Sequence, residues 1–208
     1  MATRSGAGVE RINQHGLTGC VLRRNGCGDI YVTGNLRDNM TPRSLYERMA
    51  RFVEKRGGTI VRATVFGMPD EPGSGRREFH LAMGDDCPVM WLDEGSHNDP
   101  PIGGMELHAV AGPEVERVRL GDRVVGSVYS DGDARYCYLA GLRPQDTEQS
   151  RPKQAEKVFA DIEDALEAAD MTFDDVVRTW FWNDDILGWY DEFNEVRTAF
   201  FEDHGVFD

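Results

Sequence analysis

The chain has 208 residues, of which 40% are hydrophobic, and it carries a net charge of −14. This length suits one ordinary domain or two small ones. An acidic chain repels the phosphates of nucleic acids, so we expect no nucleic-acid partner. No apolar run reaches the roughly 18 residues that a membrane helix needs, and the N-terminus lacks the apolar core of a secretory signal. We therefore expect a cytoplasmic protein with no membrane partner.

The cysteines are scattered along the chain, at Cys20, Cys27, Cys87 and Cys137. None forms a C-x-x-C pair, and their spacing is not that of a zinc site. We expect free thiols in a reducing compartment, and no metal or cofactor.

In the first half, residues 1–17 mix glycine, arginine and polar residues, and we expect a flexible N-terminal arm there. Thr41-Pro42 is a typical helix start, and Gly57-Gly58 is a typical helix end. A loop with one short helical turn is expected over 69–86, and turns over 95–104. Runs rich in apolar and β-branched residues predict strands at 20–22, 29–33, 59–66, 88–92 and 105–110.

The second half restarts the same order of elements. An apolar stripe at helical spacing follows Pro152, which suits a first helical turn. The period then switches to two in a short stretch of β-branched and aromatic residues. Strands are predicted at 124–129, 136–140 and 175–182, with a turn at 130–133, and helices at 151–169 and 189–200.

These elements indicate an internal repeat. Residues 30–34 resemble 138–141, and residues 60–66 resemble 176–182, with one amphipathic helix between the members of each pair. We therefore expect two related β-β-α-β units in one chain, with helices that cover sheets.

A break at Gly112-Pro113 divides the two units, which we place at 18–112 and 113–208. The second unit reaches Asp208 without the last strands of the first. Unpaired backbone and an uncovered apolar face are unfavourable. We therefore expect either that the chain continues past Asp208 or that a partner completes the second sheet.

Three runs in the second half carry a family resemblance. They are Gln154-Ala155 … Val158-Phe159-Ala160-Asp161-Ile162, then Asp174-Asp175-Val176-Val177, then Phe193-Asn194-Glu195-Val196 … Phe200-Phe201. Over residues 136–201 this pattern resembles the RidA/YjgF family. In the first half, Met105-Glu106-Leu107-His108-Ala109-Val110-Ala111 is more weakly similar to that family's closing strand. The two-domain layout is also similar to that of the chorismatases, which are tandem relatives.

The resemblance implies a RidA/YjgF-like (chorismate-mutase-like) α+β fold with mixed sheets packed by helices. It also implies homotrimers and ligand pockets between subunits. It implies a small-molecule substrate and hydrolysis of imines and enamines, or of chorismate in the tandem relatives. Deaminating members grip the substrate carboxylate with an arginine just before a cysteine. This chain has Asp85 and Asp86 before Cys87, and an aspartate there would repel a carboxylate. The family's tyrosine on the last helix is replaced by Arg197.

Glu106 and His108 are the candidate catalytic residues. The resemblance implies that Glu106 helps to position water, and a solvated glutamate on a strand is the alternative. His108 lies two residues further on and so points to the same face. The two could form a general acid–base pair near neutral pH, or His108 could make an ordinary cross-strand contact.

Asn194, Arg197 and Arg178 are the candidate substrate-binding residues. The resemblance implies that Asn194 contacts a ligand, with packing against the sheet as the alternative. Arg197 lies close to Asn194 on the helix surface and could replace the missing arginine, or pair with a neighbouring acid. Arg178 interrupts an apolar strand and lines either a pocket or a solvated face. Its repeat counterpart Arg62 favours a structural role.

Two functions follow from these observations. The first is a hydrolase of a small carboxylate metabolite, imine deaminase-like or chorismatase-like, acting at a subunit interface. The second is a non-catalytic ligand-binding or regulatory oligomer that has lost the carboxylate-gripping arginine. Whether the chain is an enzyme is left open, with the hydrolase favoured.

Overall fold

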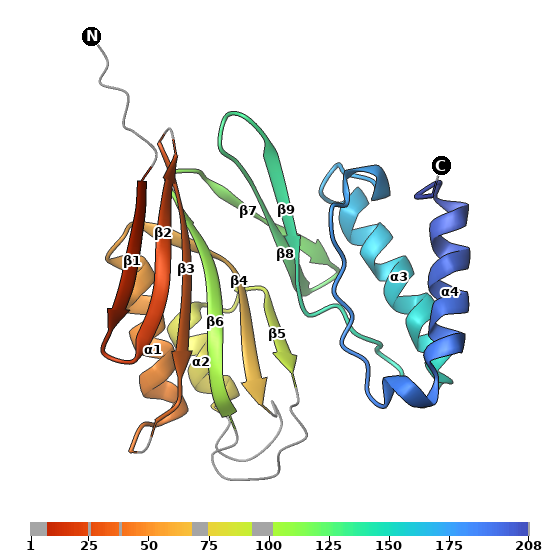
Figure 1. Ribbon diagram of the computed structural model, residues 1–208, viewed down its shortest axis with the longest axis horizontal. Coiled ribbons are helices and arrows are strands. Elements are labelled where there is room, and N and C mark those ends of the chain that lie inside the picture. Colours follow the sequence, from red (N-terminus) through yellow and green to blue (C-terminus); the bar gives the residue numbers. More distant parts are fainter. Residues whose placement is uncertain (1–7, 25, 38, 68–74, 93–101, 208) are drawn as a thin grey trace. The chain divides into compact units, whose positions relative to one another are not determined.

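The computed structural model describes residues 8–24, 26–37, 39–67, 75–92 and 102–207 (Figure 1). The chain divides into two compact units, one formed by 1–117 with 124–141 and the other by 118–123 with 142–208. An α+β fold is present, as the sequence predicts, with a six-stranded sheet, a three-stranded sheet and helices. The predicted loop at 69–74 and the predicted turns at 95–101 lie outside the described residues.

The first unit is built on the six-stranded sheet, whose strand order is β1-β2-β3-β6-β4-β5. Neighbouring strands are antiparallel except β4 and β5, which are parallel, so the sheet is mixed, as expected. The strands are β1 (Gly8–Gln14), β2 (Leu17–Arg24), β3 (Cys27–Asn35), β4 (Gly58–Gly67), β5 (Val89–Leu92) and β6 (Ile102–Ala111).

Strand β1 corrects the expectation of a flexible arm over residues 1–17 for the described part, from residue 8 onwards, and residues 1–7 lie outside the described residues. Every residue of β1 pairs with β2 across a turn at His15 and Gly16. Both turn residues have positive φ, 52° and 76°, which is the geometry of a tight hairpin turn. Of the seven residues of β1 only Ile12 is buried, so this edge strand lacks the apolar alternation that would predict it.

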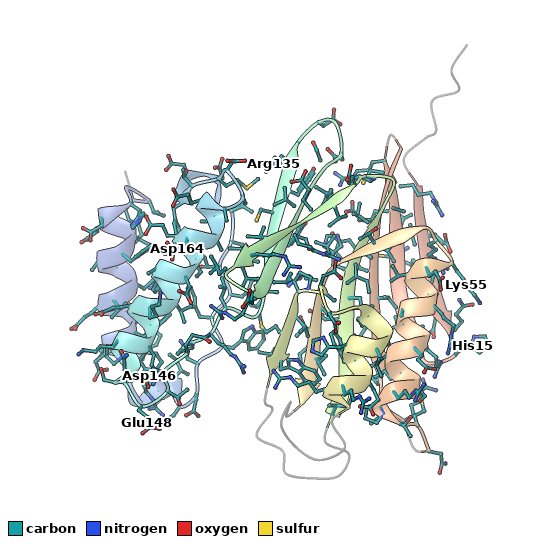
Figure 2. All side chains as sticks on the ribbon, turned by 180° about the vertical axis from the view of Figure 1, so that it is seen from behind. His15, Lys55, Arg135, Asp146, Glu148 and Asp164 are labelled. Carbon is teal, nitrogen blue, oxygen red and sulfur yellow. The ribbon has the colours of Figure 1, made fainter. Side chains whose placement is uncertain are left out.

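Two helices, α1 (Pro42–Glu54) and α2 (Arg76–Met83), cover one face of this sheet (Figure 1). Helix α1 begins where predicted, because the hydroxyl of Thr41 accepts a hydrogen bond from the Ser44 N–H at 3.2 Å. Helix α2 is eight residues long, more than the single turn expected. Figure 2, the view from behind, shows both helices in front of the sheet, with Lys55 at the C-terminal end of α1.

The alternation of side chains along the strands separates a helix-covered face from an open face. The core residues of the central strands are Ile30 and Val32 on β3, Ala63 and Val65 on β4, and Leu107 and Ala109 on β6, and they pack with Leu45, Met49 and Phe79 of the helices. The residues between them in sequence point to the open face.

A second sheet has the strand order β7-β8-β9. Its strands are β7 (Val115–Leu120), β8 (Arg123–Ser130) and β9 (Arg135–Leu139). β8 and β9 are the strands predicted at 124–129 and 136–140. In the turn between them, Asp131 accepts hydrogen bonds from the N–H groups of Asp133 and Ala134. The sequence analysis does not predict β7, because half of its residues are charged.

Within the first unit, side chains of β8 cover one end of the open face. Tyr129 is buried in a small apolar cluster with Cys27, Val61 and Val110. Ser127 is fully buried and donates a hydrogen bond to the backbone carbonyl of Val61 at 2.7 Å. These contacts leave only part of the open face accessible.

The second unit contains helices α3 (Arg151–Glu167) and α4 (Tyr190–Asp203), both where the sequence predicts helices. The two helices meet through aromatic side chains, and Phe159 of α3 stacks on Phe200 of α4 with ring centroids 4.8 Å apart. Asp161 on α3 is buried, and its carboxylate pairs with Lys157 at 2.6 Å and with Arg123 at 3.4 Å.

The strand predicted at 175–182 is absent from the described structure. Phe173–Asp175 forms a short 3-10 turn, and residues 176–182 follow it without regular secondary structure. A strand requires a neighbour that exchanges backbone hydrogen bonds with it, and no described strand lies in that position. The prediction was wrong because it used only the local sequence pattern, which does not show whether a neighbouring strand is present.

Two further expectations can be compared with the fold. The four cysteines are free, as expected. Among the described residues, no helix combines the length and the apolar character that crossing a membrane requires.

Candidate functional site

The open face of the six-stranded sheet carries two rows of mostly polar side chains across β3, β6 and β4. The register sets the members of these rows: Tyr31, His108 and Arg62 form the first, and Thr33, Glu106 and Thr64 form the second. Directly paired residues on antiparallel strands lie about 4.5–5.5 Å apart, so each row is a continuous line of side chains.

These six residues line an open, shallow hollow with an interior volume of about 70 Å³. This is well below the roughly 300–1,000 Å³ of typical small-molecule sites, so the hollow as it stands holds only a small group. A β-bulge in β4 lies between Ile60 and Arg62. Because of the bulge, Val61 joins the apolar cluster under Tyr129 while its neighbour Arg62 lines the hollow.

His108 is the most buried member of the first row, at 2% exposure. Its ring stacks on Tyr31 with centroids 4.5 Å apart, and Tyr138 of β9 meets it edge-on at 4.7 Å. Burial lowers the pKa of His108 below 6.5, although the neighbouring Asp29 acts in the opposite direction. The ring is therefore neutral at pH 7 and able to accept a proton.

A buried carboxylate decides which nitrogen of His108 carries the proton. Asp29 Oδ1 lies 3.3 Å from His108 Nε2 and accepts a hydrogen bond from the Tyr129 hydroxyl at 3.1 Å. Its other oxygen accepts from Arg24 at 2.7 Å. Since a carboxylate only accepts hydrogen bonds, we assign the proton of the neutral ring to Nε2. Nδ1 is then a free acceptor, and it is buried without a hydrogen-bond partner among the described residues.

The tyrosines around His108 form an uncharged wall. Burial raises the pKa of Tyr31, Tyr129 and Tyr138 above the usual value of a phenol. All three are therefore protonated at physiological pH. Tyr129 consequently donates to Asp29, and the surroundings of His108 are aromatic and polar but carry no phenolate charge.

Arg62 and Glu106 bring opposite charges to the hollow, and both are half-buried. The guanidinium carbon of Arg62 lies 6.0 Å from the ring centroid of Tyr138. Within the described part of the chain, Arg62 Nε is buried and has no hydrogen-bond partner. Arg62 therefore brings a cation to the lining of the hollow, as an anionic ligand requires.

The remaining predicted site residues lie in the second unit. The guanidinium of Arg178 lies over the ring of Trp180 at 5.6 Å. Asn194 and Arg197 are on α4, where Arg197 lies 5.9 Å from the ring centroid of Phe193. Asn194 Oδ1 is buried, with no hydrogen-bond partner in the described ranges. The structure therefore groups Glu106 with His108, and Asn194 with Arg197, in different units.

The position expected to hold the carboxylate-gripping arginine is acidic, and Asp86 accepts a hydrogen bond from Arg117 at 3.3 Å. Cys87 is buried, and burial raises the pKa of its thiol to about 12. A thiol with this pKa is not a nucleophile at neutral pH. The segment of Asp85, Asp86 and Cys87 thus supplies neither a cation nor a reactive thiol.

The first-unit hollow is the stronger candidate site. It combines a cation, a carboxylate and a neutral histidine, a set that suits acid–base chemistry on a small anionic molecule. Among the described residues, no three side chains of the types that bind metals come together. The sequence predicts Glu106 and His108, but it assigns Arg62 a structural role and gives Asp29 none. One sequence signal could have marked both residues as candidates: each is a charged residue at an open-face position of a strand beside β6, Asp29 on β3 and Arg62 on β4.

Comparison with solved structures shows the fold. A crystal structure of a chorismatase is similar with a TM-score of 0.53 and 11% sequence identity, over 76% of this chain and 58% of the chorismatase chain. This chain therefore spans less than two thirds of that protein. A protein from Salmonella typhimurium described as a candidate translation initiation inhibitor matches with a TM-score of 0.32 and 17% identity, over 50% of this chain and 96% of its own. Comparison with curated proteins finds no match.

The family comparison concerns the second half of the chain. Residues 128–206 match the family described as Endoribonuclease L-PSP. The match includes α3, the segment after it, and α4, which are the elements that carry the RidA/YjgF pattern in the sequence. The chain therefore carries a domain of the Endoribonuclease L-PSP (RidA/YjgF) family over residues 128–206.

Proposed function

We propose that the hollow on β3, β6 and β4 binds a small carboxylate metabolite and hydrolyses it. The observation that supports this most directly is the free Nδ1 of the buried, neutral His108 in a hollow shared with Arg62 and Glu106. Arg62 binds the substrate carboxylate through its planar guanidinium. The aromatic ring of Tyr31 forms the adjoining wall.

Glu106 and His108 act on water in this proposal. Glu106 orients the water molecule, and His108 Nδ1 accepts its proton as the oxygen bonds to the electrophilic carbon. With an imine substrate, the electron pair of the C=N bond moves to nitrogen. The nitrogen takes up the proton held by His108, which gives a carbinolamine. The hydroxyl group of the carbinolamine then passes its proton, through His108, to the nitrogen; the C=O bond forms as the C–N bond breaks, and ammonia leaves. The fold similarity to a chorismatase makes chorismate the second substrate to examine.

Turnover of an imine of pyruvate and of chorismate by the full chain tests the proposal. Removing a positioned acid–base group lowers a rate by about 10²–10⁴-fold, so Glu106→Ala and His108→Gln should lower kcat by that order. Arg62→Ala should mainly raise KM. Arg43→Ala is the matched control, because Arg43 is exposed on α1 and pairs only with Glu47 in the described structure. A full-length protein that turns over neither substrate contradicts the proposal.

A non-catalytic ligand binder is the second candidate. The acidic residues before Cys87, where deaminating relatives carry an arginine, favour it. A binder would be stabilised against heat by a small carboxylate in proportion to RT ln(1 + [L]/Kd), without turnover. Loss of that stabilisation in Arg62→Ala, with no product formed by the wild type, would select the binder.

We also propose two tandem RidA-like domains, 18–112 and 113–208, assembled as a cytoplasmic homotrimer with sites between subunits. The helix that follows a strand in each half, α1 in the first and α3 in the second, supports the repeat. On this basis Asn194, Arg197 and Arg178 contact ligand in the second domain. The mass in solution tests the trimer, and Arg197→Ala tests the second set of ligand contacts.

A further inference from the structure

Residues 177–183, here called the exposed segment, have the side-chain pattern of a β-strand. From 178 to 183 burial alternates, with Thr179, Phe181 and Asn183 half-buried and Arg178, Trp180 and Trp182 exposed, whereas Val177 at the start of the segment is fully exposed and lies outside the alternation. This period of two places the two sets on opposite sides of the segment. The rings of Trp180 and Trp182 stack with centroids 6.1 Å apart and an interplanar angle of 14°, as same-side neighbours do.

The inward side of the exposed segment is already packed. Phe181 lies 5.0 Å from the ring of Phe159 on α3 and 5.3 Å from that of Phe193 on α4. The segment is therefore held against the helices of its own unit by Phe181.

The backbone of the exposed segment is unpaired. Among the described residues, no backbone N–H or C=O group of residues 177–183 forms a backbone hydrogen bond. At the same time Val177 is 100% exposed, Trp180 64% and Trp182 58%. A row of free donors and acceptors beside exposed aromatic side chains is the template that an added strand uses.

The first unit shows which strand fits such a template. Residues 61–66 of β4 and 177–182 have the same pattern, with arginine in second place and apolar or β-branched residues around it. In the first unit this pattern is paired, because β6 runs antiparallel to β4 with His108 opposite Arg62 and Glu106 opposite Thr64. The side chains of β6 between these two polar residues point into the helix-covered core.

We infer that the exposed segment is a docking site for an antiparallel β-strand of the β6 type. Its apolar residues continue the side on which Phe181 packs, and its acidic residue and histidine lie on the side of Arg178. The negative charge of such a strand complements the arginine, and its small residues leave room for the ring of Trp182. The inference does not depend on the proposed hydrolysis.

A peptide with the sequence of β6, Ile102–Ala111, added to the full chain tests the inference by amide hydrogen exchange. At a peptide concentration of ten times Kd, exchange of the amides that receive hydrogen bonds should slow by about tenfold. Those amides should alternate along residues 177–183, because an antiparallel neighbour pairs with every second residue. The fluorescence of Trp180 and Trp182 should shift to shorter wavelength as the rings lose water.

Two controls separate strand addition from apolar adhesion. The same peptide with N-methyl groups on alternate residues cannot donate the required bonds, and it should give no protection. Leu187→Ala removes a side chain that is 90% exposed but lies outside the segment, and it should leave protection unchanged. Trp182→Ala should weaken it.

Three results would overturn the inference. The first is no slowing of exchange in the wild type at peptide concentrations up to about 1 mM, the range of very weak binding. The second is equal protection by the N-methylated peptide. The third is protection of residues 177–183 in the chain alone together with a dimer mass, which would make a second copy of this chain the occupant.

Discussion

Replacing Asp29 with alanine tests whether a buried carboxylate holds His108 in place. Asp29 is 3% exposed and accepts hydrogen bonds from His108 Nε2, the Tyr129 hydroxyl and Arg24. Asp29→Ala leaves the first two donors buried and unpaired, since His108 and Tyr129 are 2% and 3% exposed. The side chain of Arg24 is half exposed, and water can take the place of the carboxylate there.

The expected loss of stability follows from these two donors. A buried donor without a partner costs about 1–3 kcal/mol, so two of them cost about 2–6 kcal/mol. Removing the buried carboxylate also removes its own desolvation cost, which offsets part of this loss. No buried charge is left behind, because His108 is neutral and Arg24 is half exposed, so we expect Asp29→Ala to lower the free energy of unfolding by about 2–4 kcal/mol. Asp29→Asn keeps one acceptor oxygen and should lose less.

Urea denaturation measures this loss, and amide exchange of β3 and β6 assigns it to the first unit. Glu10→Ala is the control, because the carboxylate of Glu10 is largely exposed and pairs with Arg23 and Arg56 at the surface. Exposed pairs contribute about 0–1 kcal/mol. If Asp29→Ala costs no more than Glu10→Ala, the buried carboxylate does not hold His108, and the tautomer assigned to His108 loses its support.

Three further outcomes are expected. Burial lowers the pKa of His108 in the folded state, so as the pH falls the unfolded chain takes up a proton at this histidine before the folded chain does. The stability of the first unit should therefore fall from about pH 7 towards about pH 5, and His108→Gln should reduce the slope of this fall. The hydrogen bond to Glu163 raises the pKa of His204 in the folded state. The contribution of this pair to the free energy of unfolding, about 1 kcal/mol or less, should be present in acid and be lost as the pH rises through the folded pKa. Glu163→Gln should abolish this pH dependence. Gly141→Ala should destabilise by more than about 1 kcal/mol, because φ is +73° and the added Cβ would overlap the backbone carbonyl oxygen of Val89. Gly132→Ala, at φ +93°, meets nothing within 4 Å, so the same denaturation assay measures the conformational cost alone there.

The elements that could be predicted from the sequence are those whose signals are local. Helix α1 has its cap at Thr41, and α3 has Pro152 in its first turn and an apolar stripe along its length. These signals lie within a few residues of one another, because helix hydrogen bonds join residues four apart. β1 and β7 lack such signals, since at least half of the residues of each strand are polar or charged and only one residue of each is buried.

The candidate site could be predicted only in part, for a related reason. Glu106 and His108 share a strand, so the period of two is enough to place them on one face. Arg62 and Asp29 reach His108 only because β6 lies between β3 and β4 in the sheet. That order joins segments more than 40 residues apart in the chain, and no local pattern encodes it. Asp29 and Arg62, which influence the protonation of His108, could therefore not be placed beside it from the sequence alone.

The two arginines at matching positions of the repeat show how pairing, and not local pattern, decides the chemistry of a residue. Arg62 is half-buried because β6 lies beside β4 and Tyr138 lies over its guanidinium. Arg178 lies in a similar sequence pattern but has no strand beside it in the described structure, and it is exposed over Trp180. Desolvation strengthens the attraction between a guanidinium and an anion, so the paired arginine is the better anion site. A strand paired with the exposed segment would partly bury Arg178, as β6 partly buries Arg62. The affinity of Arg178 for a carboxylate should therefore rise when the strand binds.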